Sequence, residues 1–124
     1  RIVPLNGEAH VEDSVRQWTG DSRGRWEGDT LVVETTNFLR ETNFMQGATS
    51  PELTLIERFT RIDADTLQYD VTVDDPAVWT RPWTYSVPMQ RNAEPVYEYA
   101  CHEGNYGLFN ILAGAVAEAS DGSD

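Results

Sequence analysis

The chain has 124 residues, of which 40% are hydrophobic and 24% charged, and nine basic against 21 acidic residues give it a net charge of −12. This length supports one domain with a modest core, and the acidic balance argues against nucleic acid as a partner while favouring a neutral or cationic ligand. The sequence has no apolar run of about 18 residues, so no membrane span is expected.

Two stretches of one design indicate β-hairpins. Residues 27–29 form a short acidic turn that leads into the alternating run 30–35, and residues 63–65 form a second acidic turn before the run 66–73. In both stretches Asp-Thr-Leu spans the junction between the turn and the run. Two such reversals predict neighbouring antiparallel strands rather than a parallel sheet.

In chain order, strands are expected at residues 1–5, 22–26, 30–38, 52–62, 66–73, 78–87 and 96–101. The long loop 39–51 is expected either to form a functional lid or ligand rim or to tuck Phe44 and Met45 into the body. Residues 108–119 are expected to form a short helix. The predicted fold is all-β, an antiparallel meander that forms a curled sheet or a small open barrel or sandwich. A single β domain is expected over residues 1–119, with a flexible tail over residues 120–124.

Side chains alternate along a strand, which assigns them to faces. Leu67, Tyr69, Val71 and Val73 alternate with polar residues, which is typical of a half-buried strand. In the expected strand 30–38, the same rule places Phe38 on the face of Val32 and Glu34.

An aromatic ladder is the first candidate ligand site. Trp79, Arg81, Trp83 and Tyr85 would share one face of the expected strand 78–87, with the guanidinium between two indoles. Stacking there is worth roughly 0.5 to 2 kcal/mol of cation–π attraction. Such a face suits a flat or sugar-like ligand; the alternative is an edge strand capped by its own arginine.

Carboxylates on apolar faces form the second candidate site. Glu57 lies between Leu55 and Phe59 in the pattern, and Glu34 is expected to contribute to the ligand platform. A carboxylate in such a setting needs a partner, and Arg58 and Arg81 are the expected ones. A carboxylate lining a cavity could act as a general acid or base; a simple Glu–Arg pair at the rim is the alternative.

Residues 97–107 bring Cys, His and Glu close together. His102 and Glu103, with Glu57, are the candidate catalytic groups, and His102, His10 and Glu98 are the candidate ligands of a divalent or copper ion. The paired short spacing of structural zinc sites is missing. A loop histidine bonded to backbone is the alternative. Cys101 is the only cysteine, so this chain alone has no disulfide partner for it.

The segments 1–10, 17–38, 57–67, 80–84 and 97–107 together resemble the C-terminal part of a group of uncharacterised exported bacterial proteins, common in acidobacteria and proteobacteria. The resemblance covers nearly the whole chain and implies no activity. It implies a periplasmic or extracellular location, a longer precursor, and a partner for Cys101 in the preceding segment.

The leading hypothesis is a small-molecule or glycan-binding β domain of an exported protein. The first alternative is an enzyme, a lyase, isomerase or metal-assisted oxidoreductase that uses His102 with Glu103 or Glu57. The second is a structural subunit, which would form a homo-oligomer or dock the remainder of its precursor through the strand edge near Arg1.

Overall fold

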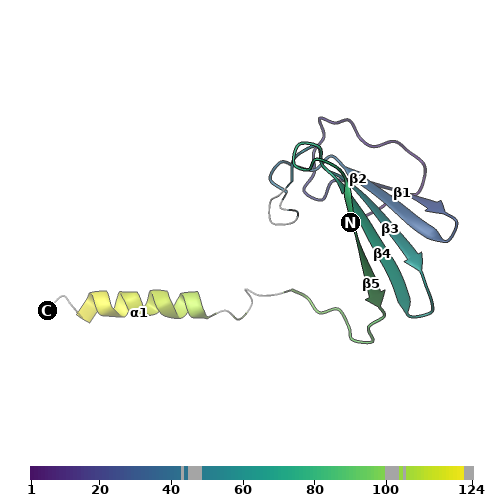
Figure 1. The fold of residues 1–124 in the computed structure, drawn as a ribbon. Helices are drawn as coiled ribbons and strands as arrows, with labels where there is room; N and C mark the ends of the chain where they lie inside the picture. The colour runs from purple at the N-terminus through teal and green to yellow at the C-terminus, as the bar shows by residue number, and fades with distance from the viewer. Residues whose placement is uncertain (43, 45–48, 100–103, 105, 122–124) are drawn as a thin grey trace. The chain divides into compact units, whose positions relative to one another are not determined.

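The computed structural model describes residues 1–42, 44, 49–99, 104 and 106–121. One open antiparallel sheet contains five strands in sequence order, and one helix follows them (Figure 1). The chain divides into two compact units, residues 1–91 and 92–124, which are described separately. The elements are β1 (Asp21–Glu27), β2 (Thr30–Thr36), β3 (Thr54–Arg61), β4 (Thr66–Asp74), β5 (Trp83–Gln90) and α1 (Gly107–Asp121). The predicted antiparallel meander with a C-terminal helix is therefore confirmed.

Both acidic turns reverse the chain. The first joins β1 to β2 through Gly28, whose φ of 58° is a left-handed value that glycine adopts without a side-chain clash. In the second, the Ile62 amide donates to the Thr66 carbonyl at 3.0 Å, and the Asp65 amide donates to the Asp63 carboxylate at 2.8 Å. These local hydrogen bonds fix the register of β3 against β4.

The register separates the sheet into two faces. On one, Phe59 lies opposite Tyr69, Val71 opposite Tyr85, and Val73 opposite Trp83. We call this the aromatic face. The other is the polar face, where the Thr72 and Thr84 hydroxyls lie 2.7 Å apart. The main hydrophobic cluster lies on the aromatic face and consists of Phe38, Leu53, Leu55, Val71 and Val73, with Phe44, Tyr69, Trp83 and Tyr85 packed against it.

Asn37 changes the face that Phe38 occupies. Alternation predicts Phe38 beside Val32 and Glu34, and that prediction is wrong, since Phe38 belongs to the core cluster of the aromatic face. Asn37 has a φ of 58°, which ends β2 and breaks its alternation. Its buried side-chain amide then donates to the carbonyls of Glu12 and Val15 at 2.9 and 3.0 Å. The expected core role of Phe44 holds; Met45 lies outside the described residues.

Three expected strands differ from the structure. Residues 1–5 form no strand; the Gly24 amide of β1 donates to the Pro4 carbonyl at 2.9 Å, so this stretch lies beside β1. Residues 78–82 form a turn and bend because the Asp75 carbonyl accepts the amides of Val78 and Trp79. In the expected strand 96–101, residues 96–99 form no strand and their side chains are exposed, and residues 100 and 101 lie outside the described residues.

The second unit contains α1 and the residues before it. The apolar side chains of Leu108, Phe109, Ile111 and Leu112 are between 58% and 71% exposed. Among the described residues, no helix has the length and apolar character needed to cross a membrane.

Candidate functional site

The turn between β4 and β5 is held by a buried aspartate. Asp75 is fully buried, and its carboxylate accepts hydrogen bonds from the Ser50 amide at 2.6 Å and the Ser50 hydroxyl at 2.7 Å. Its carbonyl accepts the amides of Val78 and Trp79 at 3.0 and 2.8 Å. Asp75 therefore joins the loop 49–53 to the turn 75–82 and fixes the backbone that carries Trp79.

This turn and the start of β5 form a small aromatic cavity. The rings of Trp79 and Trp83 meet edge to face, with centroids 5.6 Å apart and planes at 72°. Together with Thr80 and Arg81 they line a cavity of about 430 Å³, which we call the indole cavity. Trp79 remains 37% exposed, so part of its ring surface is open to a ligand. The sequence predicts that the Arg81 guanidinium lies between the two indoles, and this prediction is wrong. The indoles contact each other directly, and Arg81 belongs to the bend that connects them.

The aromatic contacts continue across the sheet. Trp83 contacts Tyr85 with ring centroids 5.9 Å apart, and Tyr85 contacts Tyr69 of β4 edge to face at 6.5 Å. Tyr69 then stacks on Phe59 of β3 at 4.7 Å. Edge-to-face and offset-stacked pairs are the favoured arrangements of aromatic rings. The cavity therefore rests on a packed row of rings, and this row holds the Trp83 indole in position.

Glu57 is buried in the same face, only 5% exposed. One carboxylate oxygen accepts the Tyr69 hydroxyl at 2.6 Å, and the other, Oε2, lies 2.6 Å from the Arg1 guanidinium. Oε2 has no hydrogen bond of regular geometry, so the ion pair is what neutralises it. Burial, reinforced by the hydrogen bond to Glu57, raises the pKa of Tyr69 above its ordinary value.

The partners expected for Glu57 were wrong. Arg58 points to the polar face and pairs with Glu27 at 2.8 Å, and Arg81 lines the indole cavity instead. Glu57 is therefore a buried carboxylate held by one hydrogen bond from Tyr69 and one ion pair with Arg1.

His10 and Glu34 form a separate cluster on the polar face. His10 Nδ1 lies 2.8 Å from the Asp21 carboxylate, and Nε2 lies 3.5 Å from Glu34. Arg23 lies 3.3 Å from the other Asp21 oxygen. Glu34 is thus on the opposite face from Trp83 and Tyr85, and the structure does not bring it to the aromatic platform.

The other candidate catalytic and metal-binding residues are only partly described. His102 and Glu103 lie outside the described residues, as does Cys101, and Glu98 is an exposed residue of the second unit. Within the ranges that the structure describes, no three His, Cys, Asp or Glu side chains are grouped to hold a metal ion.

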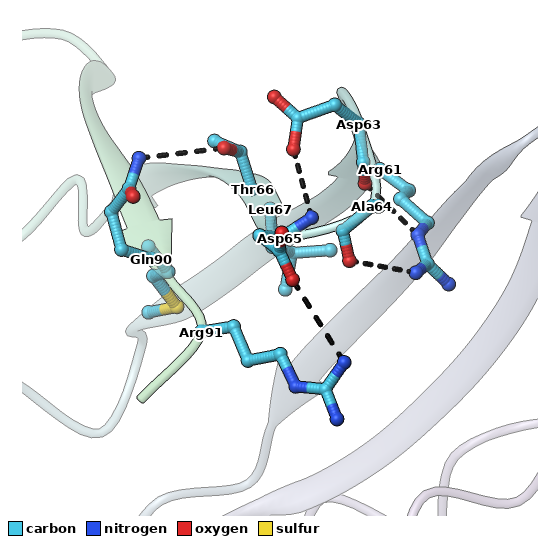
Figure 2. A pocket seen from close by; sticks show the side chains of 9 residues that line it. Arg61, Asp63, Ala64, Asp65, Thr66, Leu67, Gln90 and Arg91 are labelled. Carbon is cyan, nitrogen blue, oxygen red and sulfur yellow. Dashed lines mark hydrogen bonds and ion pairs between the residues drawn. The ribbon is translucent and has the colours of Figure 1, made fainter. Parts of the chain in front are cut away.

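A second hollow lies at the β3–β4 turn (Figure 2) and has a volume of about 410 Å³. Its charged groups are already engaged: Arg61 donates to the carbonyls of Asp63 and Ala64 at 3.0 and 2.9 Å. The Arg91 guanidinium lies 3.8 Å from the Asp65 carboxylate. Both guanidinium groups already have partners in the hairpin turn, so they are not available to bind a ligand in this hollow.

Sequence reasoning missed two interactions that shape the site. The Asp75–Ser50 hydrogen bonds join residues 25 positions apart, and the only local signal was an aspartate before Pro76 at the end of a strand. The Tyr69–Glu57 hydrogen bond required the register of β3 against β4. Alternation had placed both residues on apolar faces, but it did not show which residues lie across from each other.

Comparison with protein-family models, with curated proteins and with solved structures gives no match. The function of the chain is therefore inferred from its own geometry.

Proposed function

We propose that residues 1–91 form a binding domain for a small molecule or glycan whose ring stacks in the indole cavity. The observation that carries this proposal is the edge-to-face pair of Trp79 and Trp83 around a cavity of about 430 Å³. Aromatic rings present large apolar surfaces at little cost in side-chain entropy, and binding sites commonly use them with a few polar groups.

The fixed backbone supports the same proposal. Trp79 follows a turn that Asp75 anchors from both its side chain and its carbonyl. Trp83 is packed between Trp79 and Tyr85. A ligand would thus bind a surface that is already ordered, which lowers the entropy cost of binding. An exported setting, which the sequence resemblance implies, is part of this proposal and gives the domain access to extracellular ligands.

The test compares two tryptophan variants. Intrinsic fluorescence titrations with neutral and acidic sugar oligomers and aromatic compounds should identify ring ligands of the wild-type chain. Trp79→Ala should weaken binding about 2- to 12-fold, the equivalent of losing one aromatic contact of about 0.5–1.5 kcal/mol. Trp18→Ala is the matched control, since Trp18 is 65% exposed and does not line the cavity. Equal affinities for the two variants would overturn the proposal.

A further inference from the structure

The arginines of this chain are almost all engaged within it. The chain contains nine basic residues, all arginine. Seven make an ion pair or a hydrogen bond to another residue: Arg1, Arg16, Arg23, Arg25, Arg58, Arg61 and Arg91. Among the described residues, the two that have no such partner are Arg40 and Arg81.

Arg81 differs from Arg40 in where it lies. It lines the indole cavity together with Thr80 and the two indoles, and none of the four lining residues is acidic. The cavity therefore carries one positive charge in a chain whose net charge is −12. The net charge of the chain predicts a neutral or cationic ligand, but the charge at this cavity has the opposite sign.

The geometry points to a ligand that combines a ring with a carboxylate, such as a uronic acid sugar or an aromatic acid. This inference rests on the proposed function and adds the ligand class. The ring would stack on the Trp79 and Trp83 indoles, and the carboxylate would accept the paired N–H donors of Arg81. A guanidinium fork matches a carboxylate with two parallel hydrogen bonds.

The net negative charge of the chain favours a ligand with a single carboxylate over one with several negative charges. A polyanion or a doubly charged phosphate would be repelled by the 21 acidic residues, whereas a singly charged group needs only one guanidinium. Thr80 adds a hydroxyl to the lining, which can donate to the ligand or accept from it.

The experiment measures the affinities of acids and their methyl esters by calorimetry on the full chain. One pair is galacturonate, a monosaccharide with a single carboxylate, and its methyl ester; the other is 4-hydroxycinnamate and its methyl ester. Esterification keeps the ring and removes the charge. We expect one of the acids to bind about 10-fold or more tightly than its ester, because a hydrogen-bonded charge is lost. The acid that binds distinguishes a sugar source from an aromatic one.

Two arginine variants complete the test. Arg81→Gln should lower the affinity for the acid to that of the ester, and Arg40→Gln should leave it unchanged. Both side chains are exposed, so both variants should retain the wild-type melting temperature. If esters and acids bind equally and Arg81→Gln has no effect, the ligand class is wrong while the proposed function stands. If none of the four compounds binds, the inference fails; if neutral ring ligands also fail to bind, the proposed function fails with it.

Discussion

Replacing Tyr69 by phenylalanine removes one hydroxyl from the buried pair on the aromatic face. The hydroxyl donates to Glu57 at 2.6 Å, and Glu57 is 5% exposed. A hydrogen bond to a charged group contributes about 1.5–3 kcal/mol, and its loss leaves a buried carboxylate oxygen without a donor. We expect the free energy of unfolding to fall by about 2–3 kcal/mol. In a unit of 91 residues this corresponds to a decrease in melting temperature of about 8–24 °C.

Urea titrations followed by circular dichroism at neutral pH measure this change. Tyr85→Phe is the matched control, because Tyr85 lies on the same face and its hydroxyl makes no hydrogen bond among the described residues. Its effect should stay within about 0.5 kcal/mol. Equal stabilities for Tyr69→Phe and Tyr85→Phe would refute the reasoning that Glu57 depends on Tyr69.

Three further predictions concern stability. The raised pKa of Tyr69 disfavours its phenolate in the folded chain. The stability that this tyrosine contributes is therefore fully present below the ordinary tyrosine pKa of 10.0 and falls as the pH rises past it. Between about pH 9 and about pH 11, the urea midpoint of Tyr69→Phe should fall by less than that of the wild-type chain. Gly20→Ala places a Cβ 2.6 Å from the Thr36 carbonyl oxygen, whereas at Gly28, where φ is also positive, an added Cβ has nothing within 4 Å. Thermal melts should show about 1 kcal/mol lost for Gly28→Ala and about 2–4 kcal/mol for Gly20→Ala, and equal losses would contradict the steric argument. Asn37→Asp keeps the shape but removes the amide that donates to the Glu12 and Val15 carbonyls, so chemical unfolding should show a loss of about 3 kcal/mol or more, and an unchanged midpoint would contradict the role of this amide.

The antiparallel sheet could be predicted from the sequence because the signals for each hairpin lie close together in the chain. An acidic turn and a run of period two lie next to each other in the chain, and both hairpins depend on them. The alternation in β4 also placed Tyr69, Val71 and Val73 on one face correctly.

The candidate site was harder because single residues interrupt the regular pattern. Asn37 adopts a positive φ, and this one dihedral transfers Phe38 to the other face. Asp75 uses its carbonyl to turn the chain, so Trp79 and Arg81 lie before β5 rather than within it. Pattern rules assume continuous strands, and both Asn37 and Asp75 are held by side-chain hydrogen bonds to distant residues that the pattern does not contain.

The indole N–H resonances of the four tryptophans give the most direct test of the binding proposal. A ¹⁵N-labelled chain would be titrated with the acid that binds in calorimetry, and the resonances would be assigned with single tryptophan variants. Binding at the indole cavity predicts shifts for Trp79 and Trp83 that saturate together, with Trp18 and Trp26 unmoved. Shifts confined to Trp18 or Trp26, or no shift in any indole at saturation, would contradict it.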